Sequence, residues 1–326
     1  MKLSRLIQRA FDSTLANWPL LLIRIASSVA MTVVAVAAII PVVALFVIAG
    51  VSASLTDFET SSAIIDWAIS NVFLLLAIIA IITIAIAFAV AIHAFTTGGV
   101  AGIYLEADFA APREQWTRKD LDRFKPDRWL RHGAATWWRI FLIYNITWGL
   151  FLLLLTLPLL LIVPLVLLMD SPETMAIIGC AGAVFGLMAL IIGSIFVHVW
   201  TQIAVLQQVR RRAGVMAAIR SSFGTILGDP LRIGLLTGLL ILISLALGAF
   251  AFGFQIIVDL GSTFSELPIL FMPAQIILSL LQSLVSVVVG AWFLASLSTV
   301  VNESAAAEGI PSADRDPGPP FATSGD

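Results

Sequence analysis

Six apolar stretches, each long enough to cross a lipid bilayer as a helix, constrain the fold of this sequence more than any other feature. About 20 apolar residues in helical form span the hydrocarbon core. Apolar residues make up 60% of the chain and charged residues 12%, whereas about a quarter of an ordinary soluble domain is charged. We therefore expect an all-α, polytopic membrane protein. The six predicted spans are Leu20 to Ala49, Val72 to Phe95, Ile140 to Met169, Met175 to Thr201, Ile233 to Val258 and Ile269 to Thr299.

The basic residues are confined to alternate segments between these stretches. They fall at Lys2 to Arg24, Arg113 to Arg139, Arg210 to Arg232 and Arg315. The other linkers, Val51 to Asn71, Asp170 to Thr174 and Asp259 to Pro268, carry only acidic charges. By the positive-inside rule, this pattern predicts three transmembrane hairpins with both termini in the cytoplasm, here of a prokaryotic plasma membrane. The first stretch is too long for a signal-peptide core, so we expect it to be retained as a span.

Each hairpin is predicted to follow an amphipathic helix that lies in the cytoplasmic interface. Before the first span, apolar residues recur at three- and four-residue spacing from Leu3 to Leu15, opposite a polar face that includes Arg9. A similar stripe precedes the fifth span and ends at Asp229-Pro230. The central copy is the most divergent, with Asp120 to Trp138 as its entry helix.

These entry helices indicate an internal repeat. Phe11, Asn17 and Pro19 align with Phe223, Asp229 and Pro230. His93-Ala-Phe-Thr96, at the end of the second span, parallels His198-Val-Trp-Thr201 at the end of the fourth. We therefore expect one membrane domain over residues 1–302, with approximate repeats 1–110, 115–212 and 213–302. Residues 303–326 lack apolar periodicity and are predicted to form a disordered cytoplasmic tail.

The cytoplasmic basic residues have two interpretations. They are required for topology, and each basic group near an anionic leaflet also favours membrane binding by about 1 kcal/mol. Membrane lipids, including anionic ones, are therefore expected partners, a protein partner in the membrane is possible, and no nucleic-acid partner is expected. The candidate headgroup contacts are Arg5, Arg9, Arg123, Lys125, Arg128, Arg210, Arg211 and Arg212.

His93 and His198 are the sharpest chemical candidates, as a polar pair at one membrane level. A metal site normally needs three or four ligands, so helix-end histidines are the simpler interpretation and no metal or cofactor is expected. Cys180 is the only cysteine, which excludes an intrachain disulfide, and we expect it to be a small buried residue. No nucleophile elbow, phosphate-binding loop or His-Glu-x-x-His motif is present, so the sequence predicts no enzymatic activity.

The spans contain no Asp, Glu, Lys or Arg at depth, which argues against an ion-coupled transporter. Arg24 is the nearest exception, and it is close enough to the interface to snorkel. The motifs Gly182 to Gly186 and Gly234 to Gly238 predict close helix packing. Uncharged polar groups could line a path or bond across helices: Thr83, Asn145, Thr147, Ser194, Ser244, Gln255, Gln275 and Gln282.

The sequence resembles a loosely related set of prokaryotic six-span proteins. The resemblance rests on the entry helix with Phe11, Asn17 and Pro19, on the similar segment with Phe223 and Asp229-Pro230, and on the hairpins that follow. That set includes the membrane domain appended to some bacterial glycerophosphodiester phosphodiesterases. The resemblance covers roughly residues 1–302 and implies the six-span fold. It does not imply phosphodiesterase activity, since the chain has no room for the catalytic barrel.

Three functions remain open at this stage. A non-enzymatic, lipid-associated scaffold or assembly factor for a membrane complex fits the absence of catalytic motifs. A transporter or lipid-translocating protein fits the repeats, since many transporters are built from them. A membrane enzyme that uses the two histidines ranks third.

Overall fold

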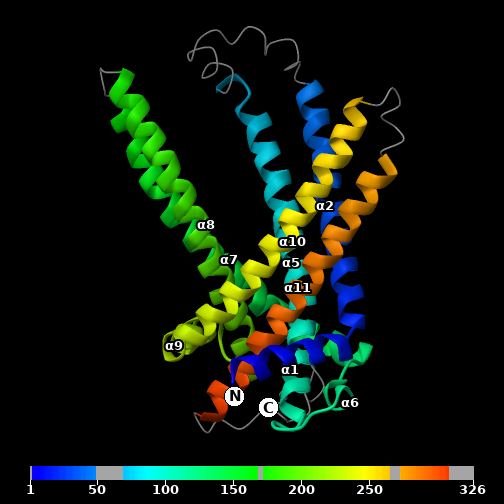
Figure 1. Cartoon of the computed structure of the whole chain (residues 1–326). Coiled ribbons are helices and arrows are strands. Elements are labelled where there is room, and N and C mark those ends of the chain that lie inside the picture. The colour runs from blue at the N-terminus through cyan, green and yellow to red at the C-terminus, as the bar shows by residue number, and fades with distance from the viewer. Residues whose placement is uncertain (1, 49–68, 168–171, 265–271, 308–326) are drawn as a thin grey trace, which may run out of the picture.

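The computed structural model describes residues 2–48, 69–167, 172–264 and 272–307, and all regular structure within these ranges is helical. Six of the helices are long and apolar enough to cross a membrane, which confirms the coarse prediction of an all-α chain with six candidate spans. Figure 1 shows the long helices gathered at one end of the molecule and diverging toward the other. The helices are α1 (Leu3–Ala16), α2 (Pro19–Ile48), α5 (Val72–Ala110), α6 (Arg118–Leu121), α7 (Pro126–Leu167), α8 (Pro172–Arg211), α9 (Val215–Gly228), α10 (Pro230–Phe264) and α11 (Met272–Ala307).

Proline sets the start of four of the long helices. Pro19, Pro126, Pro172 and Pro230 are the first residues of α2, α7, α8 and α10. Proline suits this position because its missing N–H would have no intrahelical acceptor there. The chain therefore breaks between α1 and α2 and between α9 and α10, where the sequence predicts breaks.

The predicted central entry helix, Asp120 to Trp138, is wrong as a separate element. The structure has only the four-residue α6 there, and α7 then runs without a break from Pro126 to Leu167. After Pro126 no proline or Asn/Asp-Pro break precedes the span, and Gly133 packs against Phe95 of α5 inside the helix. The amphipathic segment and the span are consequently one continuous helix.

Several helices extend beyond the apolar stretches at their basic ends. Helix α5 continues from Phe95 to Ala110, which corresponds to roughly 22 Å of additional helix. Helix α8 continues to Arg211 and α11 to Ala307. Residues 303–307 of the predicted disordered tail are therefore helical, and the rest of that segment lies outside the described residues.

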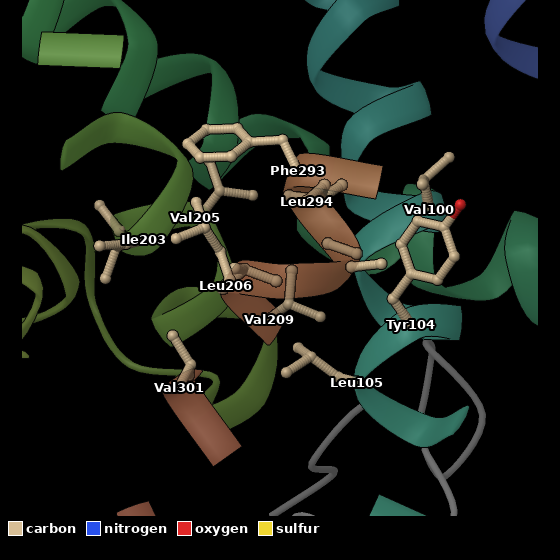
Figure 2. Close-up of a cluster of buried hydrophobic side chains, with 14 of the residues drawn as sticks. Val100, Tyr104, Leu105, Ile203, Val205, Leu206, Val209, Phe293, Leu294 and Val301 are labelled. Carbon is tan, nitrogen blue, oxygen red and sulfur yellow. The ribbon is translucent and has the colours of Figure 1, made fainter. Parts of the chain in front are cut away.

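The hydrophobic core is built from these extensions. Figure 2 shows side chains from α5, α8 and α11 in contact, among them Tyr104, Leu206 and Leu294, all at most 1% exposed. The other halves of the spans carry exposed apolar side chains such as Phe185 and Leu242. Apolar surface of this kind is stable against lipid, so the core and the lipid-compatible surface occupy opposite ends of the helices.

Helices α5 and α7 approach closely through glycines that the sequence analysis did not single out. A Cβ atom at Gly98 would lie 2.4 Å from Oγ1 of Thr136, and one at Gly99 would lie 2.4 Å from the ring of Trp129 and 2.8 Å from its carbonyl oxygen. A Cβ at Gly102 would lie 2.4 Å from the ring of His132. Only glycine permits this packing.

The two predicted GxxxG contacts are wrong for the interior of the chain. Among the described residues, no atom outside the local helix backbone lies within 4 Å of a Cβ built at Gly182, Gly186, Gly234 or Gly238. Those parts of α8 and α10 lie where the helices diverge, so no neighbour is close enough to use the small residues. Cys180, predicted to be buried, is exposed on the same part of α8 for the same reason.

Helices α1 and α9 make matching contacts with different long helices. The indole of Trp292 in α11 donates to the carbonyl of Ile7 over 3.1 Å, and that of Trp200 in α8 donates to the carbonyl of Ile219 over 3.4 Å. Four residues further along each short helix, a phenylalanine packs edge-on against the same indole, with ring centroids 5.7 Å apart for Phe11 and 5.1 Å for its counterpart in α9. The apolar face of α1 is thus partly covered by protein, with Leu6 fully buried.

Candidate functional site

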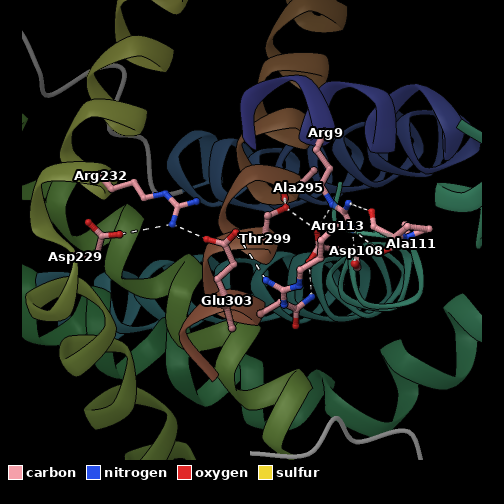
Figure 3. Close-up of polar contacts among 12 residues, drawn as sticks. Arg9, Asp108, Ala111, Arg113, Asp229, Arg232, Ala295, Thr299 and Glu303 are labelled. Carbon is pink, nitrogen blue, oxygen red and sulfur yellow. Dashed lines mark hydrogen bonds and ion pairs between the residues drawn. The ribbon is translucent and has the colours of Figure 1, made fainter. Parts of the chain in front are cut away.

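The basic end of the molecule contains a buried ion pair between α1 and α5. The Nε atom of Arg9 donates to Oδ1 of Asp108 over 2.7 Å, and its other nitrogens donate to the carbonyls of Asp108, Ala111 and Pro112 over 2.6 to 3.0 Å (Figure 3). These carbonyls lie at the C-terminal end of α5, where a cation is favoured by the helix dipole. Arg9 is only 2% exposed, so its prediction as a headgroup contact is wrong.

Helix α11 completes this junction. Thr299 donates to Oδ1 of Asp108 over 3.0 Å, and Asn302 donates to Oδ2 over 2.9 Å. The carboxylate therefore accepts hydrogen bonds from both α1 and α11. A buried carboxylate with this many donors holds three helices in one arrangement.

Two further arginines at this end serve internal contacts. Arg210 is buried and donates to the carbonyl of Val301 over 2.7 Å, so it too is wrong as a headgroup contact. Arg232 of α10 pairs with Glu303 of α11 at 2.6 Å, and Arg113 lies 3.9 Å from the same carboxylate (Figure 3). The extended end of α11 brings these partners together, and no apolar pattern in the sequence predicts that extension.

The remaining candidate headgroup contacts are more accessible. Arg5, Lys125 and Arg212 are exposed, while Arg123 and Arg211 are half-buried. Arg128 is half-buried and lies 3.6 Å from Glu106. The accessible basic surface is therefore smaller than the sequence predicts.

His93 and His198 lie in one region but have different partners. Nε2 of His93 lies 3.1 Å from the hydroxyl of Tyr144, which also accepts a hydrogen bond from Gln202 over 3.2 Å. The ring of His198 stacks on Phe293, with centroids 6.0 Å apart. Sequence reasoning missed Tyr144 as the residue that joins α5, α7 and α8, because a lone tyrosine within an apolar stretch carries no periodic signal. Within the described ranges, no three His, Cys, Asp or Glu side chains are close enough to share a metal ion.

A cavity of about 920 Å³ lies between α8, α10 and α11, with Trp148 of α7 on its wall. Its size is at the upper end of the range for small-molecule sites. Most lining residues are apolar, from Ile195 and Leu240 to Phe250. Of the polar groups that the sequence analysis proposed for a path, Ser194, Ser244 and Gln282 line this cavity, whereas Thr147 bonds across helices to Thr201 over 2.8 Å.

The basic-side end of the cavity is marked by Gly290 and His198. Arg24 of α2 reaches this point, since its Nη1 atom lies 3.4 Å from the place that a Cβ of Gly290 would take. The arrangement combines an apolar chamber with a cation and an imidazole at one end. Such a site suits an amphiphile better than a small polar solute.

Comparison with known proteins adds no assignment to this geometry. No protein-family model, curated protein or solved structure matches the chain.

Proposed function

We propose that this protein is a non-enzymatic, multi-pass membrane protein that binds membrane lipid and acts as a lipid-associated scaffold or as an assembly factor for a membrane complex. The observation that carries the proposal is the apolar cavity between α8, α10 and α11. Within a bilayer, such a chamber between spanning helices is accessible to lipid acyl chains, which match its lining. A protein partner in the membrane would then associate with the lipid-loaded form.

In this proposal, the six spans form three hairpins in the plasma membrane of a prokaryote, with both termini in the cytoplasm. The one-sided distribution of Lys and Arg supports that orientation. Helices α1 and α9 lie along the cytoplasmic interface, and the exposed side chains of Arg5, Lys125 and Arg212 meet lipid headgroups there.

Two sets of matching contacts support an internal repeat. The tryptophan contacts of α1 and α9 are one set. The other consists of hydrogen bonds from the second helix of a hairpin to its first: Thr96 donates to Ser27 over 3.1 Å, and Thr201 pairs with Thr147. Phe11 aligns with its counterpart in α9, and Thr96 aligns with Thr201, in the sequence alignment of the repeats, as expected if the units share an origin.

Orientation can be tested by labelling single cysteines in a chain whose native Cys180 is replaced by Ser. An impermeant maleimide applied to intact cells should label cysteines at Ser54 and Ser262 and spare those at Ser4 and Ser304. Ser54 lies outside the described residues, and Ser262 belongs to the last turns of α10. Labelling of the opposite pair would refute the proposed topology.

Lipid binding can be tested by filling the cavity. Gly248 lines it, and a Cβ at this position meets no atom within 4 Å, so Gly248→Trp places a large ring in the chamber without a clash at its root. Gly253→Trp is the matched control, because this glycine is on the same helix, is equally unobstructed and does not line the cavity. After purification in mild detergent, Gly248→Trp should retain several-fold less lipid per chain than Gly253→Trp. Equal retention by the two variants would contradict the proposal.

Lipid translocation is the second candidate function. It is favoured by Ser194, Ser244 and Gln282, which place hydrogen-bonding groups along an otherwise apolar chamber. Protein-dependent movement of a fluorescent phospholipid between the leaflets of sealed vesicles would establish this function. Absence of such movement, together with lipid retention, would leave the scaffold.

A further inference from the structure

We infer that Arg24 is the headgroup-binding residue of the cavity and that its ligand is an anionic phospholipid, held with its phosphate at Arg24 and its acyl chains between α8, α10 and α11. This inference rests on the proposed lipid-binding function and specifies the lipid. Its two foundations are an arginine without a counter-charge and the position of that arginine at the end of the cavity.

Arg24 differs from the other arginines that enter the packed end of the molecule. Arg9 pairs with Asp108, Arg232 with Glu303, and exposed arginines of the α6 and α7 region also have carboxylate partners. In the ranges that the structure describes, Arg24 makes no hydrogen bond and no ion pair. Its electrostatic neighbours are uncharged or basic groups: Tyr104, Tyr144, His93 and His198.

A guanidinium in such a place requires an anion. Arg24 is half-buried and lies near the start of the first candidate span, where the surrounding helices and the lipid of the proposed membrane would limit its access to water. An unpaired charge in a low-dielectric environment is unstable unless a counter-ion or several hydrogen bonds satisfy it. The acidic side chains of α5, Glu106 and Asp108, are already engaged by His132 and Arg9. The missing partner is therefore expected from a ligand.

The guanidinium of Arg24 lies beside the cavity wall, next to a lining residue that has no side chain, since its Nη1 atom is 3.4 Å from the place that a Cβ of Gly290 would take. A side chain at Gly290 would therefore stand between the arginine and the cavity. His198 lines the same end and is exposed, which adds an imidazole within the electrostatic reach of the arginine. A phosphate at this point could accept charge-assisted hydrogen bonds from the arginine, whose planar group suits a phosphate better than a lysine would.

The dimensions of the chamber match one leaflet. On α10 the lining runs from Thr237 to Ala251, roughly 21 Å along the helix axis. Half of the hydrocarbon core of a bilayer is about 15 Å thick. A phospholipid of the leaflet on the basic side, with its phosphate at Arg24, could therefore lie along the chamber with its chains directed toward Phe250. The charge and the apolar lining select the same orientation.

The test compares two phospholipids that have identical acyl chains, phosphatidylglycerol and phosphatidylcholine. The full chain is purified in mild detergent, incubated with equal amounts of both lipids, and examined by native mass spectrometry for bound lipid. We expect the native protein to prefer phosphatidylglycerol, and Arg24→Gln to lose about 10-fold of that preference, as for one buried charge-assisted contact. Arg220→Gln is the matched control, since it removes an equal charge from an exposed position outside the cavity and should leave the preference unchanged.

Two further variants separate charge from folding. Arg24→Lys keeps the charge and should retain most of the preference. Gly290→Val keeps the arginine but inserts a side chain between it and the chamber, so it should lower the preference for phosphatidylglycerol. If Arg24→Gln fails to fold, an unchanged preference in Gly290→Val overturns the inference.

The inference and the proposed function can fail separately. If Arg24→Gln prefers phosphatidylglycerol as strongly as the native chain, while Gly248→Trp binds less of both lipids, the headgroup assignment is wrong and lipid binding stands. If the native chain binds neither lipid, the proposed function is wrong. If excess inorganic phosphate abolishes the preference without displacing bound lipid, Arg24 holds a free anion and the lipid assignment is overturned.

Discussion

The ion pair between Arg9 and Asp108 offers the most direct test of how the basic end is held together. We consider Asp108→Asn, which keeps the shape of the side chain but removes its charge. The change leaves the guanidinium of Arg9, 2% exposed, without a counter-ion. Breaking a buried ion pair from one side typically costs about 3 to 5 kcal/mol of folding free energy, because the remaining charge stays desolvated.

Arg9→Met should have an effect of similar size for the complementary reason. It leaves the Asp108 carboxylate with only Thr299 and Asn302 as donors, and it removes the donors that satisfy three carbonyls at the end of α5. The double variant removes both charges together. Its loss of stability should therefore be smaller than the sum of the two single losses by about 3 kcal/mol, as expected for residues in direct contact.

The assay is reversible unfolding in mixed micelles, followed by circular dichroism at a fixed detergent composition. Arg118→Met supplies the control, because Arg118 is 63% exposed and its contact with Asp12 is 3.3 Å long. An exposed pair of this kind contributes at most about 1 kcal/mol. The reasoning is refuted if Asp108→Asn costs no more than the control, or if the losses of the two single variants simply add in the double variant.

Three other predictions concern separate parts of the fold. Gly99→Ala should lower the free energy of unfolding by about 1 to 3 kcal/mol in thermal unfolding, because its Cβ would meet the carbonyl oxygen of the facing helix at 2.8 Å. Gly182→Ala is the control and should be neutral or slightly stabilising, since its Cβ meets no described neighbour within 4 Å. Equal effects of the two variants would show that α5 and α7 are not in close contact. Hydrogen bonds from the backbone N–H and hydroxyl of Thr117 hold the pKa of Asp120 below its ordinary value. The carboxylate therefore contributes to the free energy of unfolding at pH values above its unfolded pKa, and this contribution is lost as the pH falls through its folded pKa. Thr117→Ala removes the hydroxyl and keeps the backbone N–H, so it should raise that pKa part of the way in a carbon-13 NMR titration, and an unchanged pKa would exclude the hydroxyl contact. Glu303→Gln should lower the thermal midpoint of unfolding, since it removes the carboxylate that lies 2.6 Å from Arg232 of α10. A truncation after residue 302 should lower the midpoint at least as far. An unchanged midpoint in both variants would mean that the end of α11 does not hold α10.

The sequence predicted the spans well because hydrophobicity is a local property that sums along the chain. Within the described ranges, each apolar stretch falls inside one long helix, and the breaks at Pro19 and Pro230 are where the sequence predicts them. The prediction of a separate central entry helix was wrong because a helix continues wherever no helix-breaking residue interrupts it. Nothing after Pro126 interrupts the helical hydrogen bonds, so an amphipathic segment and a span merged into one helix.

Predictions about packing were less successful for a related reason. The motif at Gly182 to Gly186 states only that a close approach is possible, and the divergence of the helices removes the neighbour. Gly98 and Gly99 lie after the end of the second apolar stretch, and a search for spans by hydrophobicity alone does not include them. Arg9 shows the same limit, because its burial depends on Asp108, 99 residues away in the chain.

The sequence by itself determined the class of this protein, the number of its candidate spans and the side on which its basic residues gather. These follow from transfer free energies and charge, which each segment carries wherever it lies. The tertiary structure alone decided which charges are paired, where the cavity lies and that Arg24 stands beside its end with no counter-charge from the part of the chain that the structure describes. Those properties depend on distances between helices far apart in the chain, and no local pattern of residues encodes such distances.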